Sequence, residues 1–289
     1  MNRSNKRNNL FHIKWMSKIS IAILLSFSFC SYAQHTIPPP HIPVAKKTNT
    51  IQSNDTTSKG SLSSEKPTLK TSRKQYVNIG YDENYQKLPK LIFETADEAE
   101  FLSLEKKKYI ETFKPEGEGN YFYIQTRLKK HKFKKYNDYG GKLGWSGYEF
   151  SGYYPATKLY AITEHSTSEN INFSQLFLLD SLNGYNYNII SFGDASVALP
   201  VPSINNKYFV YFYNAVYDHK NCDIGILKIN HKSNPKTYLS EYASYRSADF
   251  AVEKIIWKTD NSFIVKGYEE VYENNQWIKK YKFFKTEFK

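Results

Sequence analysis

Few residues of this chain have the type and spacing that chemistry requires. The run DHKNCD, Asp218–Asp223, gathers two aspartates, a histidine and a cysteine, which is a donor set that could hold a metal ion. A closed zinc site needs four ligands, commonly supplied as two pairs, and the sequence supplies no second pair to match this one. We therefore expect the run to be a loop between strands, with no metal and no cofactor.

Two carboxylates are candidates for acid–base chemistry. Glu164 stands beside His165, and Asp194 lies in the sequence FGDAS. Acid–base catalysis needs such groups within hydrogen-bonding reach of a reacting atom. The chain has no Gly-rich phosphate loop, nucleophile elbow or paired-histidine zinc motif. We therefore assign no catalytic residue and favour a protein that is not an enzyme.

The stretch YGGKLGWSGYEFSGYY, residues 139–154, contains five glycines and six aromatic residues. Aromatic rings presented from Gly-rich loops can stack on sugars or apolar ligands, which makes Trp145, Tyr148 and Tyr153 the candidate ligand-binding residues. Two other interpretations stay open. Glycines also mark turns and bulges while aromatic rings fill the space between sheets, and the abundance of Tyr and Phe is typical of AT-rich coding.

Strands must position most of these residues. From residue 76 to the C-terminus, 43 of 214 residues are Phe, Tyr or Trp, and such residues favour the half-buried surface of a sheet. One helix is predicted, over residues 96–108. Thr95 and Glu98 have the spacing of a capping box, and acidic residues precede lysines in the order that the helix dipole prefers.

A turn followed by an apolar strand recurs four times. The stretches PEGEGNYFYIQ, YYPATKLYAIT, PSINNKYFVYF and WKTDNSFIVK each place a Pro or aromatic residue and four turn-forming residues before the strand. In three of these units a second strand begins 16 to 19 residues after the first. The spacing predicts local antiparallel hairpins, with strands near residues 120–126, 158–164, 175–180, 207–213, 223–229, 262–268 and 280–288.

Strands that are apolar on both faces must be covered on both faces, and stacked neighbouring repeats do this. The turns PSINNKYFV and WKTDNSFIV resemble those of WD40-like and TolB-type propeller blades, and VEKIIWKTDNSFIVK is similar to the last repeats of uncharacterised secreted Bacteroidetes proteins. The resemblance covers residues 113–289. It implies a mainly β fold of four to five short, antiparallel, propeller-like blades. A β-sandwich is the alternative. Short strands at Tyr76–Ile79 and Leu91–Phe93 are expected to join the last unit and close the ring.

The N-terminal third is typical of an exported protein. Residues 1–33 combine basic residues, a short apolar run and a small-x-small site, which predicts a signal peptide cleaved after Ala33. An uncut membrane anchor and a translation start at Met16 are alternatives. Residues 34–75 hold no aromatic residue and are predicted to be a disordered linker. Residues 76–289 then form a single β-repeat domain.

Charge argues against nucleic acid as a partner. The formal net charge is +12, but residues 76–289 hold 28 basic and 26 acidic side chains, a net charge of only +2. Binding through phosphates requires a larger excess of basic groups. The only cysteine after the predicted cleavage site is Cys222, so no intramolecular disulfide is expected.

One basic run remains, RLKKHKFKK at residues 127–135. Alternation on a strand would place Lys130, Lys132 and Lys134 on one side and His131 and Phe133 on the other. We interpret the run as an edge strand that its lysines guard against mispairing. The alternative is a patch for an anionic surface, such as lipopolysaccharide, lipid headgroups or an acidic glycan.

The sequence therefore predicts a secreted or periplasmic, monomeric binding or scaffold protein of the cell envelope, with a protein or glycan partner. No transmembrane span is expected after cleavage. A hydrolase or lyase acting on an envelope glycan or peptide polymer is the alternative. A pair of carboxylates converging in a pocket would favour the enzyme, and a cavity with only aromatic and hydroxyl groups would favour binding.

Overall fold

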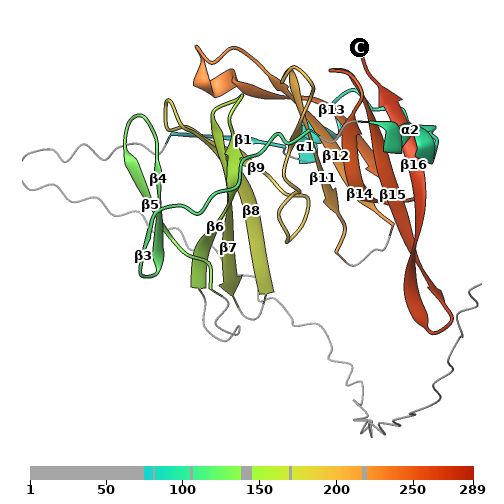
Figure 1. The fold of residues 1–289 in the computed structure, drawn as a ribbon, viewed down its shortest axis with the longest axis horizontal. Helices are drawn as coiled ribbons and strands as arrows, with labels where there is room; N and C mark the ends of the chain where they lie inside the picture. The colour runs from blue at the N-terminus through green and yellow to red at the C-terminus, as the bar shows by residue number, and fades with distance from the viewer. Residues whose placement is uncertain (1–74, 81, 105–106, 138–144, 169–170, 217–219) are drawn as a thin grey trace, which may run out of the picture. The chain divides into compact units, whose positions relative to one another are not determined.

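The computed structural model describes residues 75–80, 82–104, 107–137, 145–168, 171–216 and 220–289, all within one unit, Thr68–Lys289. Their structure is mainly β, in several antiparallel sheets, and among these residues none of the sheets closes into a barrel (Figure 1). The predicted signal peptide and nearly all of the predicted linker lie outside the described residues.

Four sheets follow one another along the chain. The β3–β5 sheet contains β3 (Gly117–Glu118), β4 (Tyr121–Gln125) and β5 (Lys130–Lys134). The β6–β9 sheet contains β6 (Trp145–Tyr154), β7 (Leu159–Ser168), β8 (Ile171–Asp180) and β9 (Asn186–Ile189). The β10–β13 sheet contains β10 (Val201–Pro202), β11 (Tyr208–Asn214), β12 (Cys222–Ile229) and β13 (Leu239–Ser247), with the 3-10 turn η1 (Pro235–Thr237) before β13. The β14–β16 sheet contains β14 (Ala251–Trp257), β15 (Ser262–Glu273) and β16 (Gln276–Glu287).

The predicted strands and hairpins are confirmed. Strands β4, β7, β8, β11, β12, β15 and β16 lie at the seven predicted places. The pairs β7–β8, β11–β12 and β15–β16 are antiparallel neighbours. In each sheet the recurring turn joins the first strand to the second, so the apolar strand that follows the turn is internal to its sheet.

The recurring turns share backbone geometry in two of the four units. Gly119 and Asn206 occupy the same place, two residues before β4 and β11, and both have positive φ, 51° and 57°. Glycine and asparagine tolerate this left-handed conformation better than other residues do. In the turn before β7, the residue with positive φ is instead Lys158, one residue before the strand.

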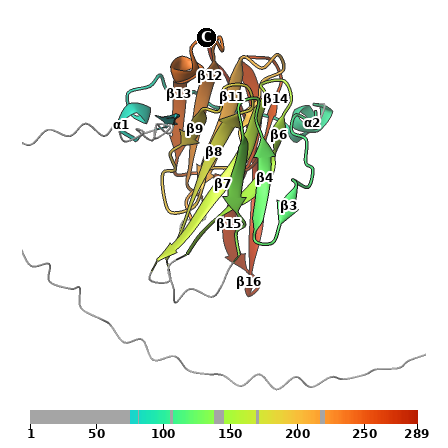
Figure 2. The same ribbon diagram turned by 90° about the vertical axis from the view of Figure 1, so that its left-hand side faces the viewer.

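The sheets pack face to face in chain order (Figures 1 and 2). Strand β11 shows how the middle layers are filled. Phe209 and Tyr211 belong to the core shared with the β6–β9 sheet, whereas Val210 belongs to the core shared with the β14–β16 sheet. The predicted burial of both faces of this strand is therefore confirmed.

The two end layers are covered differently. The outer face of the β14–β16 sheet presents Ile256 and Ile264, which pack against Phe101 of the short helix α2 (Glu98–Ser103). The β3–β5 sheet packs one face, through Phe122 and Ile124, on the β6–β9 sheet. Its opposite face carries exposed polar side chains.

Two N-terminal strands add to sheets that later strands form, and only the second of them joins the last unit. Strand β1 (Tyr76–Ile79) forms where expected, yet it pairs in parallel with β9 and not with the last unit. The segment Leu91–Phe93 is not a strand, and its contact is with β13: the Leu91 backbone N–H donates to Ser244 O at 2.9 Å. The neighbouring β2 (Glu94–Thr95) does pair with β16 of the last unit.

The predicted helix at 96–108 is correct in place and wrong in length. α2 spans Glu98–Ser103, and its N-cap is Asp97, because Thr95 is engaged in β2. Only Phe101 of this helix is buried, so little packing favours further turns beyond it. A second short helix, α1 (Asp82–Tyr85), was not predicted.

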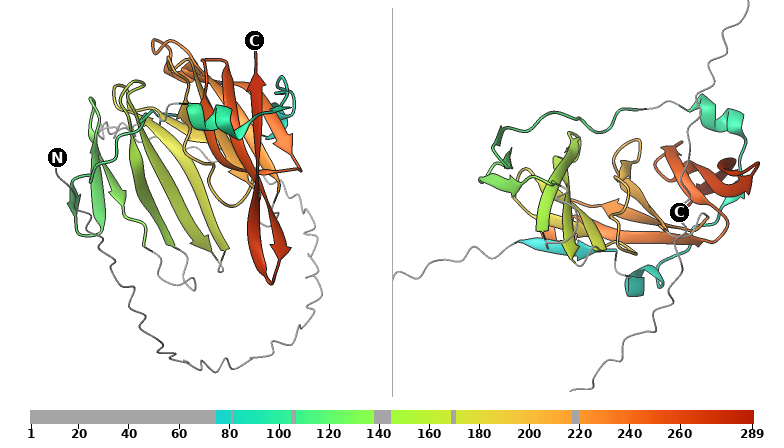
Figure 3. Two further views of the ribbon diagram at one scale, coloured as in Figure 1. Left: turned by 45° about the vertical axis from the view of Figure 1, so that its right-hand side comes forward. Right: turned by 90° about the horizontal axis from the view of Figure 1, so that it is seen from below.

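The β15–β16 hairpin extends beyond its neighbours as a two-stranded ribbon (Figure 3). Strand β14 pairs with β15 only as far as Tyr268, whereas β15 and β16 pair as far as Glu273 and Gln276. The turn between them is Asn274–Asn275, both with positive φ, which is the geometry of a type I′ hairpin turn.

Candidate functional site

The candidate site is a cavity of about 280 Å³ at the polar ends of β7 and β8. It brings together the two carboxylates that the sequence singled out, Glu164 and Asp194, which lie 30 positions apart in the chain. Hydroxyl and amide groups supply most of the other polar atoms. The described lining residues are Glu164, Ser166, Phe173, Ser174, Gln175, Ile190, Ser191, Gly193 and Asp194.

Strand pairing positions one wall of this cavity. Glu164 lies opposite Gln175, and Ser166 lies opposite Phe173, in the antiparallel register of β7 and β8. The first half of β8 is exposed or half-buried, whereas its last five residues are buried. Strand β9 pairs only with the buried half, from Leu176 to Leu179, so the polar half of β8 is left for the cavity.

The loop that follows β9, residues 190–196, supplies the other wall. It replaces β9 along the edge of β8, because Ser174 N donates to Asp194 O at 2.8 Å and Ser196 N donates to Ser174 Oγ at 2.6 Å. Ser191 Oγ donates to Ala195 O within the loop. These bonds fix the backbone that carries the Asp194 carboxylate.

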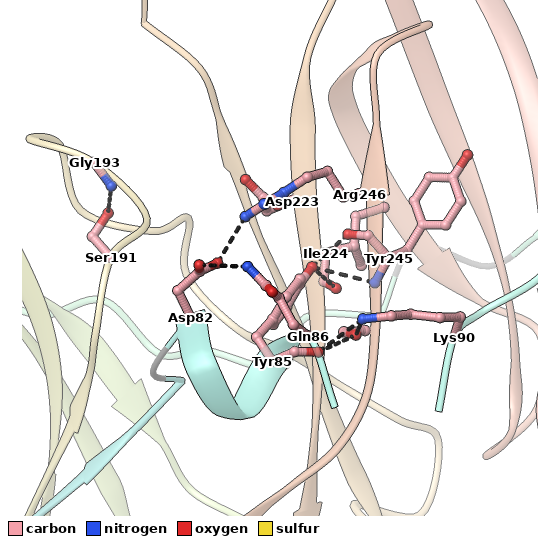
Figure 4. A network of polar contacts seen from close by, with 11 residues as sticks. Asp82, Tyr85, Gln86, Lys90, Ser191, Gly193, Asp223, Ile224, Tyr245 and Arg246 are labelled. Atoms are coloured by element: carbon pink, nitrogen blue, oxygen red, sulfur yellow. Dashed lines mark hydrogen bonds and ion pairs between the residues drawn. The ribbon is translucent and has the colours of Figure 1, made fainter. Parts of the chain in front are cut away.

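Tyr85 of α1 packs against this loop through Phe192. Its ring meets Phe192 edge-on, with ring centroids 4.5 Å apart. The buried Tyr85 hydroxyl is hydrogen-bonded to the carbonyls of Ile224 and Tyr245, and it accepts from Tyr245 N at 3.2 Å (Figure 4). Burial raises the pKa of Tyr85 far above its usual value, so this hydroxyl keeps its proton.

Charged groups fasten the same helix. Arg246 donates through Nε to Asp223 Oδ1 at 2.6 Å and through a terminal nitrogen to Asp82 Oδ1 at 2.9 Å (Figure 4). Lys90 Nζ donates to Tyr85 O at 2.9 Å. Helix α1, which was not predicted from the sequence, therefore fixes the loop of the candidate site to the β10–β13 sheet.

Tyr148 ties Glu164 to the neighbouring strand β6. The Tyr148 hydroxyl donates to Glu164 Oε1 at 2.9 Å. Burial, followed by the hydrogen bond and the charge of Glu164, raises the pKa of Tyr148 to about 12. The phenol therefore stays a donor at physiological pH and orients one carboxylate oxygen of Glu164.

His165 faces away from Glu164 along the strand and does not join it in a dyad. Its Nε2 lies 3.4 Å from Glu149 Oε2, and its ring lies 4.2 Å from that of Tyr136. Nε2 is buried and has no hydrogen-bond partner. The proximity of Glu164 and His165 in the sequence is therefore not proximity of their functional groups.

The predicted ligand-binding residues lie on β6, which is a strand and not a Gly-rich loop. Tyr148 packs against Phe133, with ring centroids 5.2 Å apart, and Tyr153 packs against Tyr160 at 4.7 Å. The Trp145 side chain lies outside the described residues, although its backbone pairs with Thr167. Binding of a ligand by these three residues stays a prediction.

Two glycines of β6 serve close packing and a bulge. The register of β6 against β7 shifts between Phe150 and Gly152. Gly152 has φ of 146°, and a Cβ there would lie 2.7 Å from Ile110 Cγ1. A Cβ at Gly147 would lie 2.7 Å from Lys135 O, so both positions require glycine for a neighbouring segment to approach.

A second cavity, of about 410 Å³, lies on the other side of the same loop. Its described lining is apolar, hydroxyl, amide and aromatic: Ser151, Thr163, Ala195, Ser196, Val197, Ala198, Leu199, Phe212, Tyr213 and Asn214. The first cavity, which we call the carboxylate-lined cavity, has the pair of carboxylates expected of an enzyme. The second has the aromatic and hydroxyl groups expected of a binding protein.

Within the part of the chain that the structure describes, no group of three or more His, Cys, Asp or Glu residues is placed to hold a metal ion. Two residues of the Asp218–Asp223 run, Asp218 and His219, lie outside the described residues. Cys222 and Asp223 belong to β12, where Cys222 is buried. The described helices include none long and apolar enough to cross a membrane.

Sequence reasoning found the two carboxylates but not their partners. For Ser174, Gln175 and Ser191 the sequence predicts a strand or a loop and no role in a site. The available signal was the change from polar to apolar residues halfway along INFSQLFLLD, residues 171–180. No family model matches this chain, and no curated protein and no solved structure matches it.

Proposed function

We propose that this is an exported binding protein of the cell envelope and that the carboxylate-lined cavity holds a hydroxyl-rich glycan without cleaving it. The observation that supports this most directly is the lining itself. Two carboxylates, three serine hydroxyls and one glutamine amide surround about 280 Å³, and sugars are bound through such hydrogen-bonding groups.

The charge and the apolar surface of the cavity restrict the chemical class of the ligand further. Its described lining includes Glu164 and Asp194 but neither Lys nor Arg, so an anionic ligand would be repelled. Phe173 is 43% exposed and offers an aromatic ring to the apolar face of a sugar. The ligand class is therefore a neutral or cationic glycan.

The cleaved leader, the disordered linker and the envelope location are part of this proposal and rest on the sequence pattern. Mass spectrometry of the protein recovered outside the cytoplasm should find Gln34 at its N-terminus. An intact Met1 or Met16 terminus on that protein would contradict export by a cleaved signal peptide.

We further infer that the four sheets are propeller-like repeats. The recurring turns, the central apolar strands and the face-to-face packing in chain order support this. Strand β2 adds an N-terminal segment to the last sheet, as propellers do when they join their ends. A β-sandwich would instead pair strands from distant units as its rule.

A binding experiment with matched variants tests the glycan proposal. Neutral N-acetylglucosamine oligosaccharides and cationic glucosamine oligosaccharides are titrated into the protein, and Glu164→Gln and Asp194→Asn are compared with Glu287→Gln and Asp249→Asn on exposed positions elsewhere. The cavity variants should weaken binding at least about tenfold, because each loses a charged hydrogen-bond acceptor. Equal affinities for all four variants would contradict the proposal.

A hydrolase or lyase is the second candidate, because Glu164 and Asp194 converge on one cavity. In such an enzyme one carboxyl group protonates the leaving oxygen and the other acts as base or nucleophile. The Tyr148 hydroxyl on Glu164 would then orient that group. Release of new chain ends from a polymer, abolished by Glu164→Gln, would support this candidate.

A further inference from the structure

The outer face of the β3–β5 sheet is rich in lysine and tyrosine. An end sheet needs only polar side chains on its outer face, so this composition asks for a further explanation. Alternation along β4 and β5 places six side chains on the face opposite the Phe122 and Ile124 core. We name this set the lysine–tyrosine face: Tyr121, Tyr123, Gln125, Lys130, Lys132 and Lys134.

These side chains form three cross-strand pairs in one row. Tyr121 lies opposite Lys134, Tyr123 opposite Lys132, and Gln125 opposite Lys130. All are exposed except Tyr123, which is half-buried. Since residues two apart on a strand are separated by about 6.6 Å, the three lysine side chains leave the strand at a regular repeat.

Two of the three lysines, Lys130 and Lys132, are held against the tyrosine rings of the sheet. Lys132 Nζ lies 4.0 Å from the centre of the Tyr121 ring, and Lys130 Nζ lies 4.7 Å from that of Tyr123. Such cation–π contacts restrain the ammonium groups. The row is therefore partly ordered before any ligand arrives, which lowers the entropic cost of binding.

The charge of this region stands out from the rest of the domain. Residues 114–135 hold seven Lys and Arg side chains and two Glu side chains, whereas residues 76–289 as a whole have a net charge of +2. Two acids lie beside this face: Glu116 pairs with Lys130 at 2.7 Å while 71% exposed, and Glu118 accepts from the Tyr123 hydroxyl at 3.2 Å. A surface pair of this kind contributes little, so an anion on a ligand can replace it.

We propose that the lysine–tyrosine face binds an acidic polysaccharide that lies along β4 and β5. Carboxylates of the polymer would meet Lys130, Lys132 and Lys134, and its hydroxyl groups would meet the Tyr121 phenol and the Gln125 amide. This surface is separate from the carboxylate-lined cavity and has the opposite charge preference, so it does not depend on the function proposed for that cavity.

The same face fits two other polyanions less well. Insertion into a membrane interface requires a buried apolar surface, and on this face the aromatic rings lie beneath ammonium groups. Single-stranded nucleic acid binds by stacking bases on aromatic rings, and here Lys130 and Lys132 already occupy a ring face of each tyrosine.

The test uses polygalacturonate, a linear polyuronate, titrated into the full chain at low and moderate salt. The variant Lys130→Gln/Lys132→Gln/Lys134→Gln is compared with Lys228→Gln/Lys236→Gln/Lys254→Gln, which removes three exposed lysines elsewhere and changes the net charge equally. Circular dichroism confirms that both variants are folded. We expect the first variant to lose at least tenfold in affinity and the second to lose less than twofold.

Tyr121→Ser is expected to weaken polygalacturonate binding severalfold, because it removes the ring that restrains Lys132 and withdraws the hydroxyl group from the outer end of the side chain. Phosphatidylglycerol vesicles and a single-stranded oligonucleotide are measured beside the polyuronate, with dextran as the neutral control. Equal losses in the two triple variants, no binding of polygalacturonate, or tighter lysine-dependent binding of the vesicles or the oligonucleotide would overturn the proposal.

Discussion

Asp260 and Asn205, which occupy equivalent positions in two successive repeat turns, are hydrogen-bonded to each other. Asn205 donates to the Asp260 carboxylate through its backbone N–H at 2.7 Å and through its side-chain amide at 3.0 Å. Ser203 Oγ donates to the same carboxylate at 3.0 Å. The turns that introduce β11 and β15 are therefore joined directly, and the β10–β13 and β14–β16 sheets are linked by polar groups as well as by their shared core.

The hydrogen bonds to Asp260 predict that the free energy of unfolding depends on pH. Burial alone would raise the pKa of Asp260, but the hydrogen bonds from Asn205 and Ser203 outweigh it and lower that pKa. A folded-state pKa below the unfolded one stabilises the protein above the unfolded value, about 4, and the contribution is lost as the pH falls through the folded pKa. Asp260→Asn should therefore reduce the free energy of unfolding at pH 7 by about 1–3 kcal/mol.

Denaturant unfolding between pH 7 and pH 3 measures this contribution. The difference between the wild type and Asp260→Asn should shrink below about pH 4, while Asp249→Asn, at an exposed position, should differ little from the wild type throughout. A difference that is constant with pH, or that grows as the pH falls, would show that the Asp260 carboxylate is not stabilised by these hydrogen bonds.

The stacking of sheets predicts that Val210→Asp unfolds the domain. Val210 is fully buried between the β10–β13 and β14–β16 sheets, and an unpaired carboxylate there costs more than the whole domain can offset. Lys228→Asp, at an exposed position near the end of the adjacent strand β12, is the control and should stay folded. A Val210→Asp protein that melts cooperatively near the wild-type temperature would contradict the internal position of β11.

Burial also predicts that Cys222 is unreactive in the folded protein. Its side chain is 2% exposed, and burial, together with the nearby Asp223 charge, raises the pKa of the thiol. Because thiol reagents attack through the thiolate, labelling should be at least about 100-fold slower than for an exposed cysteine. Lys228→Cys in a Cys222→Ala background supplies that comparison. Similar labelling rates would contradict the buried position.

The contact between Tyr148 and Glu164 predicts a shifted titration. Tyr148 should ionise near pH 12, and Glu164→Gln should lower its pKa, because the charge that opposes the phenolate is removed. NMR of ring-labelled tyrosine, assigned with Tyr148→Phe, follows this ionisation. A Tyr148 titration unchanged by Glu164→Gln would mean that the two groups do not interact in solution.

Much of the fold could be predicted because its signals are local. The turn before Tyr208 and the apolar run after it specify one strand, and the spacing to Cys222 specifies its hairpin partner. Strand β1 was misassigned to the last unit, because parallel pairing with β9 joins residues more than 100 positions apart and has no local signature. Helix α1 was missed for a related reason: its four residues are held by tertiary contacts of Tyr85 and not by helix propensity.

The candidate site was less predictable than the fold. Glu164 and Asp194 were identifiable as carboxylates, but their convergence depends on a loop that replaces β9 beside β8. That replacement follows from where β9 stops pairing, which is a property of the assembled sheet. The sequence predicts that the Tyr148 ring stacks on a ligand. In the structure the Tyr148 hydroxyl also donates to the Glu164 carboxylate.

The central claim, that the carboxylate-lined cavity binds an envelope glycan and does not cleave it, is tested most directly by one combined measurement. The protein is incubated with neutral N-acetylglucosamine oligosaccharides, and the bound fraction and the number of new chain ends are determined in the same sample. We predict saturable binding that Glu164→Gln and Asp194→Asn weaken, with no new chain ends in excess of a protein-free control. New chain ends that increase with time and disappear in Glu164→Gln would contradict this claim and establish the enzyme.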